Sequence, residues 1–117
     1  MNKDCIFCKI INREIPTKII FEDDEVIAFN DIHPIAPTHV LIIPKEHIES
    51  VNELTENDKY EKLMGRLVIV AKKIAEEEGI SGKGYQLLIR TGKDGGQEVP
   101  HIHLHLIGGK WKVKPNF

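Results

Sequence analysis

The stretch His101-Ile102-His103-Leu104-His105-Leu106-Ile107 decides the fold and function that this sequence predicts, because three imidazoles alternate with apolar side chains. In an extended strand, successive side chains point to opposite faces, so we expect the histidines on one face and the apolar residues buried on the other. Imidazole titrates near neutral pH and can serve as nucleophile, proton carrier or metal ligand. The stretch therefore predicts a strand that carries a functional site.

Composition and charge limit the classes of protein to consider. The 117 residues are 41% hydrophobic and 29% charged, which fits one domain spanning residues 1–117. A formal net charge of −2 gives no electrostatic case for nucleic acid or a membrane surface as partner. No stretch matches a signal peptide or a membrane span, so the expected location is cytoplasmic.

The rest of the chain predicts an α+β fold with a five-stranded antiparallel sheet, one long helix and one short helix. Helical spacing of apolar residues marks the long helix, with Thr55 and Asp58 as a capping box and Gly79 as its stop. Short turns between strand runs favour antiparallel pairing, with the long helix on one face. The expected helices cover residues 5–11 and 58–78, and the expected strands cover 17–21, 26–29, 40–43, 85–90 and 101–107.

A glycine-rich loop leads directly to the histidines. Gly92, Gly95 and Gly96 can adopt positive φ and let backbone N–H groups approach a ligand, which suits a phosphate-binding nest. Asp94-Gly95 is also an ordinary hairpin turn, so the loop alone is weak evidence. Its position just before three histidines favours the phosphate-binding interpretation.

Two chemical interpretations of the three histidines remain open from the residues alone. In the first, one imidazole attacks phosphorus and becomes a covalent intermediate, while a neighbouring imidazole orients it. In the second, His101, His103 and His105 hold a catalytic zinc ion with water as the fourth ligand. Covalent catalysis predicts an adduct that can be trapped, which the zinc mechanism does not.

Cys5 and Cys8 form a C-x-x-C pair near the N-terminus. In a reducing cytosol this spacing indicates metal ligation or redox chemistry more than a structural disulfide. A redox pair normally starts a helix after a strand of a βαβ unit, and no strand can precede Cys5 here. Metal ligation is therefore favoured.

The segment from Gly95 to Gly109 (GGQEVPHIHLHLIGG) resembles the signature of the histidine triad superfamily. Residues 9–16, 19–24, 36–39 and 43–45 are similar to its Hint branch, so the resemblance covers nearly the whole chain. It implies a homodimer whose two sheets join into one. It also implies a nucleotidyl hydrolase that cleaves purine nucleoside 5′-phosphoramidates, with adenosine 5′-monophosphoramidate as the type substrate, through a nucleotidyl-histidine.

The resemblance assigns roles residue by residue. His103 matches the nucleophile, His105 the partner that contacts phosphate, and His39 a histidine of the supporting network. Asp31 matches the carboxylate that binds the ribose hydroxyls. Positions lining the base pocket are matched by Phe7, Ile10, Phe29, Ile32 and Leu41; further nucleotide contacts are expected from Gly96, Gln97 and, across a dimer interface, Trp111.

Two positions depart from the Hint pattern, which usually has asparagine at Arg90 and often serine at Glu98. That serine hydrogen-bonds the leaving nitrogen, whereas Glu98 could donate a proton only with a raised pKa, and its charge would repel phosphate. Arg90 could offset this charge or bind a phosphate oxygen. The hypothesis is that the two residues act as a unit, with Glu98 catalytic and Arg90 binding nucleotide, and shift the preference for leaving groups.

Some bacterial members that this chain resembles carry a structural zinc ion held by a C-x-x-C pair, a histidine after Pro-Lys-x and the first histidine of the triad. Here these residues are Cys5, Cys8, His47 and His101. Two thiolates and two imidazoles make a closed tetrahedral site, so zinc is structural and catalysis needs no cofactor. The alternative is that the cysteines are small buried apolar residues.

Other functions remain open at the level of the sequence. A dinucleoside polyphosphate hydrolase of the same superfamily is the nearest enzymatic alternative, and Arg90 slightly favours it. A nucleotide-binding regulatory module with weak turnover is a second alternative. The substitution His103→Ala distinguishes a binding module from an enzyme. A binding module keeps its function, whereas an enzyme loses nearly all of its activity.

Overall fold

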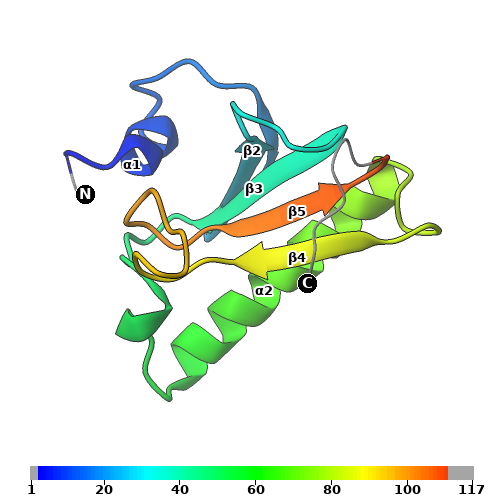
Figure 1. Cartoon of the computed structure of the whole chain (residues 1–117). Coiled ribbons are helices and arrows are strands. Elements are labelled where there is room, and N and C mark those ends of the chain that lie inside the picture. The colour runs from blue at the N-terminus through cyan, green and yellow to red at the C-terminus, as the bar shows by residue number, and fades with distance from the viewer. Residues whose placement is uncertain (1–2, 111–117) are drawn as a thin grey trace.

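The computed structural model describes residues 3–110, so Trp111 lies outside the described part of the chain (Figure 1). Two α-helices, five strands and a 3₁₀ turn follow one another in this range. In chain order they are α1 (Ile6–Ile11), β1 (Ile19–Glu22), β2 (Val26–Asn30), β3 (Thr38–Pro44), the turn η1 (Val51–Glu53), α2 (Asp58–Glu77), β4 (Tyr85–Ile89) and β5 (Leu104–Gly108).

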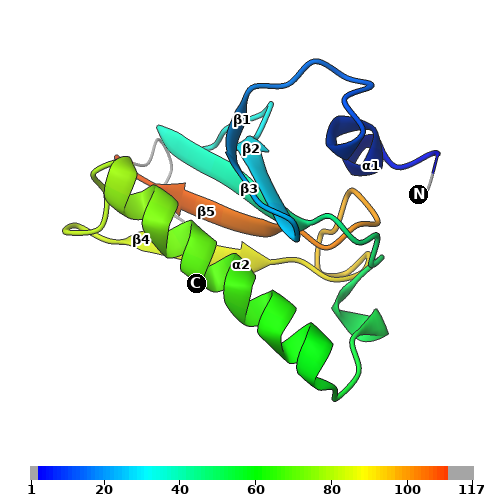
Figure 2. The ribbon, with the colours of Figure 1, turned by 180° about the vertical axis from the view of Figure 1, so that it is seen from behind.

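The five strands form one antiparallel sheet in the order β1-β2-β3-β5-β4. The chain leaves the sheet after β3, runs through α2, and returns to add β4 at the edge and β5 beside β3. Figure 2 shows α2 lying across one face of this sheet. The predicted α+β fold with a five-stranded antiparallel sheet is confirmed.

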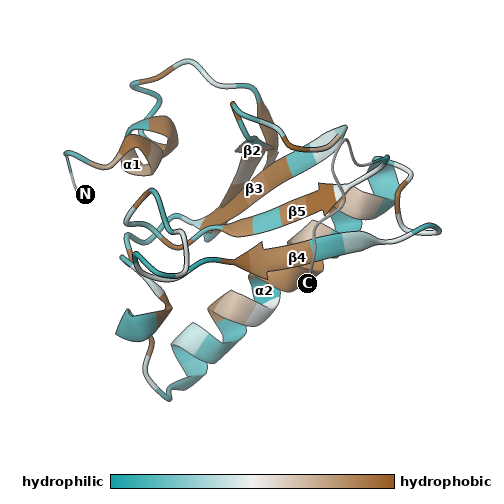
Figure 3. Ribbon diagram, in the orientation of Figure 1, coloured by the Kyte–Doolittle hydropathy of each residue, from teal (hydrophilic) through white to brown (hydrophobic). Residues whose placement is uncertain are grey.

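The face of the sheet toward α2 forms the main hydrophobic core. Alternate strand residues such as Val40 and Leu106, which are neighbours across β3 and β5, pack with Leu67 and Ile74 of α2. Figure 3 shows β3 and β5 as mostly hydrophobic, with polar interruptions in both strands. Neither helix of residues 3–110 combines the length and hydropathy needed to span a bilayer.

The opposite face carries a second, smaller core at the end of the sheet where α1 lies. Phe7 and Ile10 of α1 pack with Phe29 and Leu41 of the strands. Leu41 is the neighbour of Phe29 on one side and of His105 on the other, so the three share one face. This register brings the N-terminal helix and the histidines to the same end of the molecule.

The ends of α2 show how local sequence sets its length. Asn57 caps the N-terminus by accepting the Tyr60 N–H at 2.9 Å, so the predicted capping box of Thr55 and Asp58 is wrong. Gly79 has φ +74° and follows the last helical turn, as predicted. The Ile80 N–H donates to the Ala75 carbonyl at 3.1 Å, closing a Schellman motif.

The last strand begins at Leu104, three residues later than the sequence predicts. Its neighbour β3 ends at Pro44, which has no N–H to offer, and the Pro44 carbonyl oxygen pairs with His101 Nε2 at 2.8 Å. The Ile102 N–H donates instead to the Ile48 carbonyl at 2.7 Å. Of the three histidines, only the last lies in β5, so the expectation of three imidazoles on one strand face is wrong.

Candidate active site and metal-ligand cluster

His103 is held with one ring nitrogen occupied and the other available. Its Nδ1 donates to the His101 carbonyl oxygen at 2.8 Å, which places the proton of the neutral ring on Nδ1. The ring packs edge-on against Phe7 and lies 4.9 Å from the His105 ring between centroids. The lone pair of Nε2 is therefore oriented by the backbone and is available for attack on an electrophile.

His39 and His105 form a chain of hydrogen bonds with a defined direction. The Ile35 N–H donates to His39 Nδ1 at 3.2 Å, so the neutral His39 ring carries its proton on Nε2. That Nε2 lies 2.9 Å from His105 Nδ1, which accepts. His105 must then carry its own proton on Nε2, a buried nitrogen without a partner in residues 3–110. This N–H is a donor that a ligand oxygen would satisfy.

Asp31 directly follows β2 and extends the same network. Its N–H donates to the His39 carbonyl at 2.8 Å, and its Oδ1 accepts the His33 N–H at 2.8 Å. Its Oδ2 lies 3.2 Å from His39 Nε2. The carboxylate is thus fixed beside the histidines, while enough of it is exposed to accept hydroxyl protons from a ligand.

Burial keeps these imidazoles neutral. It lowers the pKa of His105 to about 4, with further lowering by the neighbouring His103 and His39 rings. Burial also lowers the pKa values of His103 and His39, although the Asp31 carboxylate opposes both shifts. Near pH 7 the His103 nitrogen therefore keeps its lone pair.

The residues predicted to hold the base are brought together with one exception. Phe7 and Phe29 meet edge-on with ring centroids 5.6 Å apart, and Ile10 and Leu41 belong to the same apolar cluster. Ile32 lies outside it, next to Asp31, and is 85% exposed. An exposed apolar side chain beside a carboxylate is suited to cover one face of a bound ring.

The glycine loop is closed by its own hydrogen bonds. The Gly96 N–H donates to the Lys93 carbonyl at 3.1 Å, and the Gly92 N–H donates to the Gln97 side chain at 2.9 Å. These two N–H groups already donate hydrogen bonds within the loop, which corrects the expectation that they are available to bind phosphate. Gln97 also donates to the Glu49 and Val99 carbonyls, and so it clips the loop to the segment after β3.

A pocket of about 520 Å³ opens on this loop. Glu98 lies on its wall, and Arg90 packs beside Gly96. No ion pair joins Arg90 to Glu98 within residues 3–110. The pocket is lined by Gly92, Lys93, Gly96, Gln97, Glu98 and Pro100.

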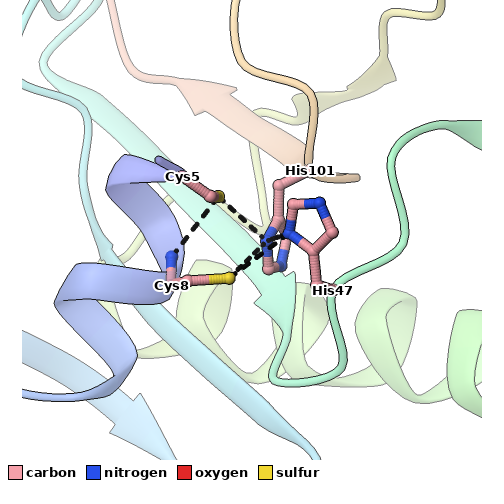
Figure 4. A group of neighbouring side chains, drawn as sticks. All are labelled: Cys5, Cys8, His47 and His101. Atoms are coloured by element: carbon pink, nitrogen blue, oxygen red, sulfur yellow. Dashed lines mark hydrogen bonds between the residues drawn. The ribbon is translucent and has the colours of Figure 1, made fainter. Parts of the chain in front are cut away.

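A second polar cluster joins the start of α1 to His101, the first histidine of the motif (Figure 4). His101 Nδ1 lies 3.4 Å from Cys5 Sγ, 3.7 Å from Cys8 Sγ and 3.2 Å from His47 Nδ1. The distance from Cys8 Sγ to His47 Nδ1 is 3.3 Å. Because His101 donates from Nε2 to the Pro44 carbonyl, its Nδ1 lone pair points into the cluster.

These four side chains fit a tetrahedral zinc ion. With Zn–N bonds of about 2.0 Å and Zn–S bonds of about 2.3 Å, the edges of the tetrahedron are about 3.3 Å between nitrogens and about 3.5 Å between nitrogen and sulfur. The observed separations are 3.2–3.7 Å. Burial lowers the pKa of His101 to about 4 and raises that of the Cys5 thiol, and a bound cation would reverse the thiol shift by taking the thiolate.

The three histidines of the sequence motif do not face one common point. The two groups of possible ligands within 4.8 Å of one another in residues 3–110 are the cysteine–histidine cluster and Asp31 with His39 and His105. Neither group contains all three, and His103 joins neither. This placement does not support the catalytic zinc interpretation.

Sequence reasoning missed two backbone groups that orient the site. The Pro44 carbonyl selects the tautomer of His101, and the Ile35 N–H selects that of His39. Backbone groups carry no residue signature, although a proline after a buried apolar run signals where regular strand pairing ends. Lys93, on the pocket wall, was also missed, although its charge inside a glycine loop was visible in the sequence.

The fold and this histidine network together define a histidine triad domain. Residues 12–112 match the HIT domain family, and the chain belongs to that family. It is 53% identical over 110 residues to the purine nucleoside phosphoramidase of Escherichia coli, covering 94% of this chain and 91% of that protein.

Solved structures of similar proteins share the fold. A HIT family hydrolase from Legionella pneumophila has 50% identity and a TM-score of 0.88, covering 96% of this chain and 98% of that one. A histidine triad protein from Clostridium difficile has 44% identity and a TM-score of 0.90, covering 100% of this chain and 98% of that one.

Proposed function

We propose that this protein is a nucleotidyl hydrolase that cleaves purine nucleoside 5′-phosphoramidates through a covalent nucleotidyl-His103. The observation that carries the proposal is the pair of oriented nitrogens described above. His103 presents a lone pair at Nε2, and His105 presents an N–H that has no partner within residues 3–110. A nucleophile beside a donor suits attack on a phosphorus centre with an oxygen to be stabilised. The name of the E. coli relative supports the same reaction.

The reaction proceeds in two displacements. His103 Nε2 attacks the α-phosphorus, the P–N bond breaks, and the leaving amine takes a proton from solvent. Water then attacks the phosphorus and gives a proton to solvent, the bond to His103 breaks, and a nucleoside monophosphate is released. In both steps the His105 N–H donates to a phosphate oxygen, and His39 holds His105 in the required tautomer.

Substrate binding uses the groups around this centre. The Asp31 carboxylate accepts the ribose hydroxyls, and the base lies between exposed Ile32 and the apolar cluster beneath it. Gly96 and Gln97 set the shape of the loop on the phosphate side.

Cys5, Cys8, His47 and His101 hold a structural zinc ion in this proposal. The support is the tetrahedral spacing and the inward lone pair of His101. Zinc bound there crosslinks α1 to the segment before β5. Catalysis does not pass through it, because the four ligands leave no open position for substrate.

The protein acts as a cytoplasmic homodimer in this proposal. Both cysteines are free, and thiolate ligands stay reduced in a reducing compartment. β4 lies at an edge of the sheet, where a second copy can continue it. Trp111 is proposed to reach the site across that interface.

Trapping the adduct tests the function. Wild-type protein is mixed with adenosine 5′-monophosphoramidate, quenched within milliseconds and analysed by intact mass. We expect an added AMP on wild type and on His33→Ala, a control at an exposed loop histidine, and none on His103→Ala. Turnover without an adduct would favour the metal-hydroxide mechanism, and undiminished function in His103→Ala would favour a binding module. Dinucleoside polyphosphates in the same assay test the nearest alternative.

A further inference from the structure

Arg90 lies on the face of the sheet that carries the catalytic histidines. Leu88 of β4 is the neighbour of His105 on β5, so their side chains share a face. Arg90 comes two residues after Leu88 and directly after the last residue of β4, which brings it to the end of that face. The position is also one where the sequence departs from the pattern it resembles.

The Arg90 side chain lies against the glycine loop. A Cβ atom added at Gly96 would lie 3.4 Å from Arg90 Cδ and 3.9 Å from Nε. Gly96 has φ +81°, a conformation that side-chain-bearing residues rarely adopt. The Arg90 side chain therefore lies within van der Waals reach of the loop at Gly96.

Arg90 is half-buried and has no counter-ion among residues 3–110. No hydrogen bond or ion pair of its side chain, or of the Lys93 side chain, is found within residues 3–110. Its charge acts on the His39, His103 and His105 rings and lowers the pKa of each. A partly desolvated guanidinium without a carboxylate is suited to bind an anion that arrives with a ligand.

The pocket of about 520 Å³ adjoins this cation. Lys93 and Gly96 line it, and Glu98 is the one carboxylate among the lining residues. Its lining includes neither Asp31 nor the residues of the apolar cluster, which are proposed to hold ribose and base. The pocket is thus available to another part of a bound substrate.

We propose that Arg90, assisted by Lys93, forms an anion subsite that selects leaving amines carrying a carboxylate or phosphate. The inference rests on the proposed phosphoramidase function and names its substrate class: a nucleoside phosphoramidate whose amine bears a negative charge. It replaces the hypothesis of an Arg90–Glu98 unit, because the structure does not pair these residues.

A matched pair of substrates tests the subsite. Adenosine 5′-phosphoramidates of glycine and of glycinamide differ in one charge and have nearly the same shape. We expect wild type to favour the glycine compound about tenfold in kcat/KM, as one charge-assisted hydrogen bond supplies. Arg90→Gln should reduce the ratio to about one, and Lys93→Gln should reduce it by less. The ratio is internal to each variant, so a general loss of folding does not alter it.

Controls separate this inference from the function on which it rests. Lys83→Gln removes one exposed positive charge away from the pocket and should keep both the ratio and the basal rate. Turnover of adenosine 5′-monophosphoramidate reports the phosphoramidase activity alone. Calorimetric Kd values of His103→Ala, with and without Arg90→Gln, for the two compounds test the subsite even without turnover. A wild-type ratio near one, or a ratio unchanged in Arg90→Gln, overturns the proposal. The adenosine 5′-phosphoramidate of aminomethylphosphonate, compared with that of glycine, shows whether the subsite prefers a phosphonate or a carboxylate.

Discussion

His101 of the metal-ligand cluster and His103 of the catalytic cluster adopt opposite tautomers, and a backbone carbonyl sets each one. The Pro44 carbonyl accepts a hydrogen bond from His101 Nε2–H, so the lone pair of Nδ1 points toward the cysteines. The His101 carbonyl accepts a hydrogen bond from His103 Nδ1–H, which leaves the lone pair on Nε2. Two histidines separated by one residue are thereby given different chemistry.

The clusters also differ in where their polar atoms point. In the metal-ligand cluster, thiols and imidazoles converge within 4.8 Å, which suits an ion enclosed by protein. In the catalytic cluster, His39 donates a hydrogen bond to His105, and the chain ends at His105 Nε2–H, which has no partner in residues 3–110. Mutations in the metal-ligand cluster should therefore mainly lower stability, and mutations in the catalytic cluster should mainly lower activity.

The largest effect is expected at His103. His103→Ala should lower kcat/KM for adenosine 5′-monophosphoramidate by about 10⁴-fold or more, because the attacking group is lost. Its zinc content and Tm should stay close to wild type, since His103 is in neither ligand group. Steady-state kinetics, metal analysis and thermal melting measure the three quantities. Loss of zinc together with activity would show that the clusters are not separate.

The second largest effect is expected in the metal-ligand cluster and should leave the two clusters distinguishable. Cys8→Ser should abolish near-stoichiometric zinc binding and lower the Tm by about 10 °C, as a loss of about 2 kcal/mol does in a domain of this size. Protein is purified without chelator, and metal content is measured by mass spectrometry. Chelation of wild type provides the matched control and should reproduce the shift. Wild-type protein without zinc would refute the structural metal site.

A smaller effect is expected at the carboxylate beside His39. Asp31→Asn should reduce discrimination between ribose and 2′-deoxyribose phosphoramidates by about tenfold, because a charged acceptor for the hydroxyls becomes neutral. Ratios of kcat/KM for the two sugars measure this. Asp24→Asn, at an exposed turn, is the control. Equal losses for both sugars would instead indicate that Asp31 acts mainly through His39.

The smallest expected effect is on stability against pH. The unfolded chain takes up protons near the ordinary histidine pKa of 6.5, whereas folded His105 resists protonation down to about 4. The unfolded state therefore binds more protons in this interval, and the free energy of unfolding falls as pH drops from about 6.5 to about 4. Urea midpoints of His105→Gln should depend less steeply on pH than those of wild type, by at most one proton. His33→Gln should follow wild type.

Much of this arrangement could be predicted from residue patterns. Strand alternation and the helical period of α2 locate the elements. The C-x-x-C pair indicates metal ligation, and the family resemblance supplies His47 and His101 as its partners. The start of β5 could not be predicted, because it depends on how far β3 can pair before Pro44. The tautomers of the histidines could not be predicted either, because they are set by backbone groups that every residue carries. Arg90 was recognised as unusual, but its lack of a counter-ion is a property of packing.

The link between Cys5 and His101 joins positions 96 residues apart in sequence. A helix of six residues such as α1 has little stability of its own. During synthesis Cys5 leaves the ribosome 96 residues before the histidine that meets it. The nascent chain therefore exposes two reduced thiols and the apolar side of α1 until the segment before β5 has been translated. The contact between Cys5 and His101 therefore forms late in folding. Phe7 packs against His103 only when β5 is available to complete the sheet.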